Sequence, residues 1–198
     1  EAFDYEAGQH LTFRLALDEA ELIRCYSLSS CPGLGEPMKI GVKRVEGGRA
    51  SNWLNDNLKV GDQLLASVPE GRFVLDPETR ASSPLFLFAG GSGITPIISL
   101  LKCALTTTRR AVTLVYANRD RDSVIYEAEL GRLVESYPDR LVVQHQIDAD
   151  RGYLSSDEIQ AVLHHTDIAE IYICGPEPFM ELVETTLREA GVHEELIY

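Results

Sequence analysis

The chain has 198 residues, a formal net charge of −13 and a hydrophobic content of 44%. This composition predicts a globular protein of one or two domains. A strongly acidic surface repels phosphate backbones and anionic lipid, which argues against nucleic acid and membranes as partners. The longest apolar stretch, at 84–89, is far shorter than the roughly 20 residues of a membrane span. Since no signal peptide or basic presequence is visible, we expect a cytoplasmic protein.

Four cysteines are scattered along the chain: Cys25, Cys31, Cys103 and Cys174. A plant-type iron–sulfur cluster requires a C-x4-C-x2-C run and a fourth cysteine, and the sequence has no such run. The spacing does not suggest a disulfide framework either. We therefore expect reduced thiols, no metal site and no iron–sulfur cluster within this chain.

The first part of the sequence has the pattern of short strands. Residues 11–17 alternate apolar and polar side chains with period two, which is typical of a half-buried strand. The pattern also predicts strands at 22–26, 38–45 and 63–68, and one short helix at 51–58. Turn residues between closely spaced strands favour an antiparallel sandwich or barrel. The polar segment 76–83 is predicted as a linker or a terminal loop, which gives a first domain at 1–78.

From residue 84 onward the pattern changes to alternating strands and helices. Residues 85–89 are continuously apolar, as expected for a parallel strand covered on both faces. Further strands are predicted at 112–117, 141–147 and 171–174, and helices at 96–105, 126–137, after Ser155, and from 176 to just before 191. Ser155 and Glu158 have the spacing of a capping box. Repeated strand–helix units predict a doubly wound parallel α/β domain at 79–198.

A glycine-rich run, GGSGITP at 90–96, directly follows the first buried strand. Gly90 and Gly91 allow the backbone to turn tightly and to approach a ligand. Thr95 is predicted as the N-cap of the next helix and Pro96 as its first residue. The free N–H groups of that helix start suit a pyrophosphate. The alternative is a strand-to-helix turn that binds nothing.

Two features separate this run from the G-x-G-x-x-G fingerprint of ordinary dinucleotide-binding dehydrogenases. Pro96 stands where the fingerprint has its final glycine. Asn118 and Arg119 follow the second strand of this half, where the fingerprint expects an acidic residue. The pattern therefore points away from that class.

Two motifs of the first half carry polar groups suited to a phosphate ester. In the strand at 22–26, Arg24 and Tyr26 share one face and Ser27 follows. An arginine fork suits phosphate and a tyrosine ring can stack on a flat cofactor, although a solvent-facing Arg and a core Tyr would give the same pattern. In the second motif, Gly48 precedes Ser51, a predicted helix N-cap and a second possible anion site. A plain capped helix is the alternative.

The fourth motif, Cys174-Gly175-Pro176, ends the last buried strand. In open α/β sheets ligands bind at this edge. Cys174 is therefore either a small core residue or a residue that touches a reacting ring.

Taken in order, these motifs resemble the ferredoxin-NADP reductase superfamily across essentially the whole chain. The stretch YANRDRDSVI at 116–125 is similar to reductases of multicomponent oxygenases, such as those of phenylacetate degradation or ketosteroid hydroxylation. The resemblance implies an FAD-binding β-barrel followed by an NAD(P)-binding α/β domain. It also implies an NAD(P)H-dependent flavin oxidoreductase that passes single electrons to an iron–sulfur acceptor, such as a C-terminal ferredoxin domain outside this chain.

The resemblance assigns roles to individual residues. Tyr26 packs on the flavin ring, Ser27 lies near its hydride-accepting N5, and Cys174 approaches the nicotinamide; Ser27 and Cys174 are thus the candidate catalytic residues. Thr95 lies at the junction between flavin and nicotinamide. The remaining cofactor-binding candidates are Arg24, Val42, Lys43, Gly48, Ala50, Ser51, Gly90, Gly91, Asn118, Arg119, Gly175 and Pro176.

Two departures from the family pattern are visible. Only a short stretch precedes Gly8, so the first barrel strand of the family is expected to be missing. Tyr198 ends the chain, and it is not assigned the aromatic position that covers the flavin in the family.

Three alternatives remain open. The same fold could reduce a haem, a quinone or free flavin, or could serve as a non-catalytic nucleotide-binding subunit. Arg119 and Arg121 would favour NADPH, whereas Asp120 and Asp122 would favour NADH. FAD is preferred to FMN by resemblance alone.

Overall fold

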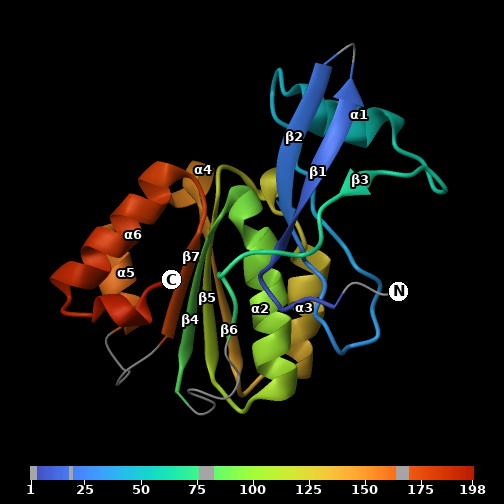
Figure 1. The fold of residues 1–198 in the computed structure, drawn as a ribbon. Coiled ribbons are helices and arrows are strands. Elements are labelled where there is room, and N and C mark those ends of the chain that lie inside the picture. Colours follow the sequence, from blue (N-terminus) through green and yellow to red (C-terminus); the bar gives the residue numbers. More distant parts are fainter. Residues whose placement is uncertain (1–3, 18–19, 76–82, 164–169) are drawn as a thin grey trace.

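The computed structural model describes residues 4–17, 20–75, 83–163 and 170–198. These residues form two sheets, a three-stranded antiparallel one from the N-terminal part and a four-stranded parallel one from the C-terminal part (Figure 1). The predicted domain boundary at 78/79 and all but the last residue of the predicted linker 76–83 lie outside the described residues.

The antiparallel sheet has the strand order β2-β1-β3. Strand β1 (His10–Leu17) pairs with β2 (Ala20–Ser27) along its whole length and with the short β3 (Leu65–Ala66) on its other side. Alternate side chains of β1 are buried with Leu28 and with Leu54 of helix α1 (Arg49–Asn57). The period-two pattern at 11–17 is therefore confirmed, while closure of the described strands into a barrel stays a prediction.

The strand predicted at 38–45 is wrong. Ile40 makes only a single bridge to Leu28, and no strand is present at 38–45. The Lys39 carbonyl accepts from the Ser29 amide at 2.8 Å, but the Lys39 amide donates to the Ser30 hydroxyl at 3.0 Å. A side chain thus takes the place of the next backbone partner, and the ladder does not continue.

The strand predicted at 63–68 is reduced to Leu65–Ala66 for a similar reason. The Ser67 amide still donates to the Thr12 carbonyl at 2.9 Å. The Thr12 amide, however, donates to the Ser67 hydroxyl at 3.0 Å, so a backbone pair is lost there. The side chain of one serine ends the pairing.

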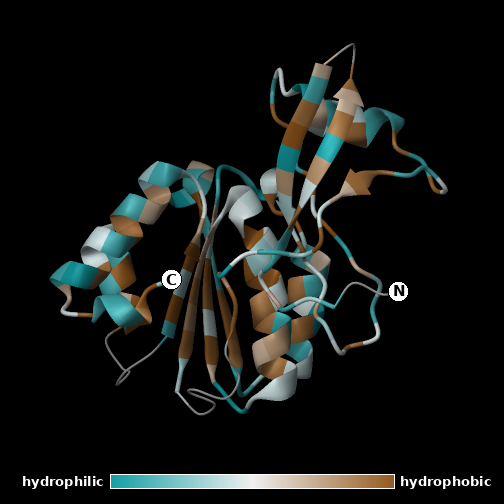
Figure 2. Cartoon of the chain, viewed as in Figure 1, coloured by the Kyte–Doolittle hydropathy of each residue, from teal (hydrophilic) through white to brown (hydrophobic). Residues whose placement is uncertain are grey.

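The parallel sheet has the order β6-β5-β4-β7. Its strands, all parallel, are β4 (Leu85–Gly90), β5 (Val112–Asn118), β6 (Leu141–Ile147) and β7 (Glu170–Cys174). Every residue of β4 is buried because helices cover both faces. The strands are mostly hydrophobic along their length, as Figure 2 shows. The predicted parallel sheet is confirmed.

The two faces of β4 belong to two separate clusters. Leu85 and Leu87 pack with helices α2 (Ile94–Thr107) and α3 (Glu127–Ser136). Phe86 and Phe88 pack with α5 (Ser156–Leu163) and α6 (Glu177–Glu189), on the other face of the sheet in Figure 1. Short turns of helix complete the described chain: η1 (Gly91–Gly93), η2 (Arg121–Ser123), α4 (Asp148–Arg151) and η3 (Glu194–Leu196).

The predicted capping box at the start of α5 is confirmed. The Ser155 amide donates to the Glu158 carboxylate at 2.9 Å, and the Glu158 amide donates back to the Ser155 hydroxyl at 3.3 Å. Helix α6 ends before Gly191, which has the left-handed φ of 83° expected beyond a helix end. In the described ranges no helix combines the length and apolar character needed to cross a membrane.

A buried ionic cluster joins the two halves. Lys102 of α2, only 4% exposed, donates to Glu36 of the N-terminal half at 2.7 Å and to Glu129 of α3 at 3.0 Å. Burial alone would raise the pKa of Glu36, but hydrogen bonds from two lysines and from the Cys31 amide lower that pKa to about 2. The cluster therefore stabilises the folded state while Glu36 is ionised.

We predict that Glu36→Gln lowers the free energy of unfolding by about 3 kcal/mol at pH 7. Because the folded-state pKa of Glu36 lies below the ordinary 4.5, this stabilisation is complete above pH 4.5 and is lost as pH falls toward 2. Urea unfolding across this range measures the difference. Glu184→Gln, which breaks an exposed pair with Arg188, is the control and should cost less than about 1 kcal/mol. A constant difference at every pH would contradict the prediction.

Candidate functional site

The strand order of the parallel sheet places a crevice at one edge. The chain leaves β4 toward β5 and β6 on one side and returns to β7 on the other, so the order reverses between β4 and β7. Ligands of open α/β sheets bind outside the carboxyl ends of the strands at such a point. Here these ends carry Gly90 and Cys174, which lie on neighbouring strands.

Glycine at this edge is required by close backbone contact. A Cβ on Gly93 would overlap the Cys174 carbonyl and lie 2.7 Å from the Gly175 nitrogen. A Cβ on Gly175 would lie 2.7 Å from the Phe179 ring and 3.0 Å from Gly90 Cα. The turn after β4 and the end of β7 can approach this closely only without side chains at these positions.

Thr95 is not the N-cap that the sequence predicts. The turn η1 runs directly into α2, which begins at Ile94, so Thr95 lies in the first turn of the helix. Its hydroxyl donates to the Ser92 carbonyl at 2.8 Å. Pro96 also lies within the first turn, where its missing N–H breaks no helical hydrogen bond. The helix start still faces the crevice.

The N-terminal side of the crevice comes from β2 and α1. Tyr26 packs edge-on against Phe13 with ring centroids 5.9 Å apart, and burial raises the pKa of its hydroxyl, which therefore stays neutral. Arg24 donates to the Ile23 carbonyl at 2.7 Å. Ser27 ends β2.

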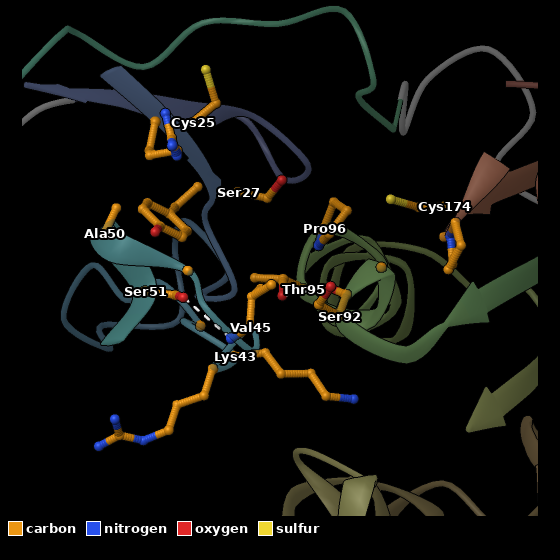
Figure 3. Close-up of a pocket in the computed structure, with 18 of the residues that line it drawn as sticks. Cys25, Ser27, Lys43, Val45, Ala50, Ser51, Ser92, Thr95, Pro96 and Cys174 are labelled. Atoms are coloured by element: carbon orange, nitrogen blue, oxygen red, sulfur yellow. Dashed lines mark hydrogen bonds between the residues drawn. The ribbon is translucent and has the colours of Figure 1, made fainter. Parts of the chain in front are cut away.

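Ser51 is not a helix cap either. Helix α1 begins at Arg49, and its N-cap Gly48 has an extended conformation with φ −72°. The Ser51 hydroxyl instead accepts a hydrogen bond from the Val45 amide at 3.2 Å, drawn in Figure 3. The first helical hydrogen bond is that from the Asn52 amide to the Gly48 carbonyl. The earlier N–H groups of the helix lie before this bond, at a positive helix end that suits an anion.

These elements enclose one cavity of about 760 Å³, here called the first cavity. The N-terminal half contributes Tyr26 and Ser27, and the α/β half contributes Thr95 and Cys174. Figure 3 shows Ser27 and Cys174 on opposite sides with Thr95 and Pro96 between them. The other lining residues are Arg24, Cys25, Gly41, Lys43, Arg44, Val45, Gly48, Arg49, Ala50, Ser51, Ser92, Gly93, Pro96, Gly175 and Pro176.

A second cavity of about 540 Å³ adjoins the first. Lys43 and Pro176 line both. The second cavity is otherwise lined by Gly90, Gly91, Ala117, Asn118, Arg119, Asp148, Tyr153, Leu154, Pro178, Phe179 and Leu182. Because Lys43 and Pro176 line both cavities, ligands bound in the two cavities would be neighbours.

Asn118 in the second cavity is 3% exposed, and within the described residues neither its amide nitrogen nor its amide oxygen has a hydrogen-bond partner. Buried polar atoms of this kind normally have partners, so this side chain suits a polar ligand. Burial raises the pKa of the nearby Asp148, whose carboxyl also lines the cavity.

The charge of the first cavity fits an anionic cofactor. Its described lining holds the four cations Arg24, Lys43, Arg44 and Arg49 and no Asp or Glu, in a chain with a net charge of −13. Arg44 is paired with Asp56 at 2.6 Å, while Lys43 donates to the Ser123 carbonyl at 3.4 Å. A cavity with cations, the positive N-terminal end of a helix and a tyrosine ring fits a flavin dinucleotide. Within the described ranges no cluster of three or more His, Cys, Asp or Glu could hold a metal.

Burial raises the pKa of Cys174, so its side chain is a neutral thiol near neutral pH. It lies at the end of β7, partly exposed to the first cavity. It therefore adds no negative charge beside a ligand there.

One predicted residue is not brought into either cavity. Val42 packs against the hydrophobic cluster of the N-terminal half, and its carbonyl accepts from the Asn55 side chain at 3.3 Å. Sequence reasoning also missed several lining residues, among them Gly41, Asp148, Tyr153 and Phe179. Of these, only Phe179 follows closely on a recognised motif, so the others carried no local signal.

Comparison with known proteins fits this geometry. Residues 1–75 match a family model described as an oxidoreductase FAD-binding domain, and residues 87–185 match an oxidoreductase NAD-binding domain. The chain belongs to the FAD- and NAD-binding oxidoreductases. The resemblance drawn from the sequence motifs is thereby confirmed.

Its relatives are components of oxygenase systems. The chain is 42% identical over 191 residues to the ferredoxin reductase component of 3-ketosteroid-9-alpha-monooxygenase from Rhodococcus rhodochrous, a match to 96% of this chain and 54% of that protein. It is 32% identical over 210 residues to one component of the 1,2-phenylacetyl-CoA epoxidase from Escherichia coli K12, over 100% of this chain and 59% of that one. The chain thus spans little more than half the length of these relatives.

A solved structure shows the same fold. Ferredoxin-NADP+ reductase from Plasmodium falciparum superposes with a TM-score of 0.82 at 23% identity, over 99% of this chain and 83% of that one. The arrangement of an antiparallel sheet before a parallel α/β domain is therefore the ferredoxin-NADP reductase fold.

We predict that Gly93→Ala lowers the free energy of unfolding by roughly 1–3 kcal/mol. The new Cβ meets backbone on the facing strand, the Cys174 carbonyl and the Gly175 nitrogen, which cannot rotate away. Thermal unfolding measures the effect. Gly131→Ala is the control, because it lies in α3 with no atom within 4 Å of its added Cβ, and should be neutral or stabilising by up to about 1 kcal/mol. Equal stability of the two variants would contradict the close contact.

Proposed function

We propose that this chain takes hydride from NAD(P)H onto FAD and that electrons then pass singly to an iron–sulfur acceptor of an oxygenase system. The observation that carries the proposal is the first cavity, which Tyr26 and Ser27 line from one half and Cys174 and Gly175 from the other. When bound, FAD supplies the conversion between two-electron hydride transfer and one-electron transfer.

In this proposal residues 1–78 bind FAD. Arg24 and the first N–H groups of α1 hold the pyrophosphate, since a guanidinium and a helix N-terminus both bind phosphate oxygens. Gly48 and Ala50 keep that approach free of bulky side chains. Tyr26 supplies a neutral ring against which a flavin can pack.

Residues 79–198 bind the nicotinamide cofactor in the same proposal. The turn at Gly90 and Gly91 leaves room for the pyrophosphate, and the buried Asn118 amide binds a polar group of the adenosine half. Arg119 lines the same cavity. Pro176 and Lys43 line both cavities, and this shared position supports a role beside both cofactors.

The work of the protein residues is positioning. Hydride transfer requires the reacting atoms to lie about 3–3.5 Å apart. Ser27 and Cys174 line the first cavity from opposite sides, and neither carries a charge near neutral pH. Two uncharged side chains can exclude water from the reacting atoms without placing a charge beside them. Both are therefore assigned to the reacting centre.

The proposed acceptor is supported by the relatives. Those named above are a ferredoxin reductase component of a monooxygenase and a component of an epoxidase. Since the chain spans 54% of the first of these, the acceptor is proposed to lie outside it. If the acceptor is acidic, a net charge of −13 repels it overall, so the docking face must be locally less acidic than the rest.

We predict that the protein purified with FAD is yellow and loses the absorbance of oxidised flavin when NADH or NADPH is added without oxygen. Stopped-flow absorbance measures the rate, and comparison of the two nucleotides gives the preference. A panel of ferredoxin, cytochrome, quinone and free flavin then identifies the acceptor. Bound flavin that neither nucleotide reduces would support a non-catalytic binding protein instead.

We predict that Arg24→Ala weakens FAD binding by about tenfold or more, because a charge-assisted hydrogen bond to the pyrophosphate is lost. Quenching of flavin fluorescence measures the dissociation constant. Lys59→Ala removes a charge of the same sign outside the cavity and should leave the constant unchanged. Equal weakening by both variants would mean that only the overall charge matters.

A further inference from the structure

The segment 119–126, which joins β5 to α3, is held in one shape by its own side chains. Asp120 accepts from the Ser123 amide at 2.8 Å and from the Ser123 hydroxyl at 2.6 Å. Hydrogen bonds from Ser123 and Arg119 lower the pKa of Asp120 to about 2. The turn therefore keeps its geometry at any ordinary pH.

Tyr126 ends this segment in a costly conformation. It is the N-cap of α3 with φ 61°, and among the described residues no other non-glycine residue has a positive φ. A left-handed residue with a side chain is sterically strained, because its Cβ lies too close to the following carbonyl oxygen. Such strain persists where the surroundings fix it, and it concentrates at functional sites.

The surroundings that fix Tyr126 are connected to the edge of the parallel sheet. The preceding Ile125 amide donates to the Tyr116 hydroxyl at 3.3 Å, and that hydroxyl donates to the Gly91 carbonyl at 3.1 Å. The Leu130 amide donates to the Tyr126 carbonyl at 2.8 Å as α3 begins. The backbone of Tyr126 is thereby tied to the turn that lines the second cavity.

The side chain of Tyr126 reaches the other half of the molecule. A Cβ on Gly41 would overlap the Tyr126 hydroxyl and would lie 3.3 Å from both its ring carbon Cζ and Thr95 Oγ1. Gly41 and Thr95 line the first cavity, but Tyr126 does not. Tyr126 therefore stands behind the wall that Gly41 forms.

The segment 119–126 makes a second contact with the N-terminal half, at Lys43, two residues after Gly41. Lys43 Nζ donates to the Ser123 carbonyl at 3.4 Å. Lys43 lines both cavities. The segment 119–126 thus contacts the N-terminal half at Gly41 and at Lys43, and Lys43 lines both cavities.

We propose that Tyr126 is a positioning residue. Its hydroxyl lies against Gly41 and thereby sets the spacing between two walls of the first cavity. One is the N-terminal wall proposed to bind flavin, and the other is helix α2, which carries Thr95. The inference rests on the proposed function, because the spacing matters for hydride transfer between cofactors in the two cavities. A tyrosine ring suits this role since it has only two rotatable side-chain bonds and its backbone is fixed.

The test uses the full chain loaded with FAD and three variants: Gly41→Ala, Tyr126→Phe and the double variant. Gly41→Ala forces its Cβ into the Tyr126 hydroxyl and should slow the limiting rate of anaerobic flavin reduction by about tenfold or more, because small displacements of reacting groups have large effects on rate. Tyr126→Phe removes the hydroxyl oxygen that the new Cβ would overlap. The double variant should therefore recover most of the rate, although it keeps the alanine in the cavity wall.

Two further readouts separate positioning from simple damage. The dissociation constant for FAD and the nicotinamide concentration that gives half the limiting rate should change less than the limiting rate itself. Thermal unfolding of the nucleotide-free proteins should show the same rescue, with Gly41→Ala destabilised and the double variant restored. Gly131→Ala, in the helix that Tyr126 caps, is the matched control and should behave as wild type.

The outcomes distinguish this inference from the proposed function. A double variant as slow as Gly41→Ala, with wild type still reduced by NADH or NADPH, overturns the role of Tyr126 and leaves the proposed function standing. A wild-type protein whose bound flavin no nucleotide reduces overturns both. Rescue of the rate and of the unfolding temperature by Tyr126→Phe supports the inference.

Discussion

The close backbone contact between the turn after β4 and the end of β7 is the constraint on which the rest of the structure depends. Gly93 meets the Cys174 carbonyl, and Gly175 meets Gly90 and Phe179, with no room for a Cβ on either side. This contact lets two parallel strands end in one shared crevice, where the strand order reverses. Both cavities open from it, and the helix start at Thr95 faces it.

The N-terminal half must then be held against this edge. Three hydrogen bonds between the halves do so. The Ser99 hydroxyl donates to the Ser30 carbonyl at 2.6 Å, and Lys102 donates to Glu36 at 2.7 Å. The Tyr172 hydroxyl donates to the Val74 carbonyl at 2.9 Å. Buried polar contacts are directional, so they fix one arrangement more strictly than apolar packing alone. The first cavity depends on that arrangement because its lining comes from both halves.

The elements that could be predicted from sequence are those with local causes. The run at 85–89 is apolar throughout, so its burial between two helical layers follows from composition. The glycine-rich turns at Gly90 and Gly175 mark the crevice for the same reason, because glycines after a buried strand indicate close approach. Most of the candidate residues near these turns do line a cavity.

The predictions that failed depend on neighbouring turn geometry or on residues distant in sequence. Thr95 and Ser51 have the residue type of helix caps, but each helix begins before them, since the preceding turn already has helical geometry or a glycine cap. The segment 38–45 has the residue pattern of a strand, yet the Ser30 hydroxyl interrupts its pairing. The role of Gly41 depends on Tyr126, a residue 85 positions away that carries no motif.

The most direct measurement of the central claim is a crystal structure of this chain with FAD and NAD+ bound. We expect the flavin ring to lie against Tyr26 and Ser27, the nicotinamide to enter beside Cys174 and Gly175, and the two rings to face each other within contact distance. Rings bound in separate regions, with protein between them, would contradict the claim.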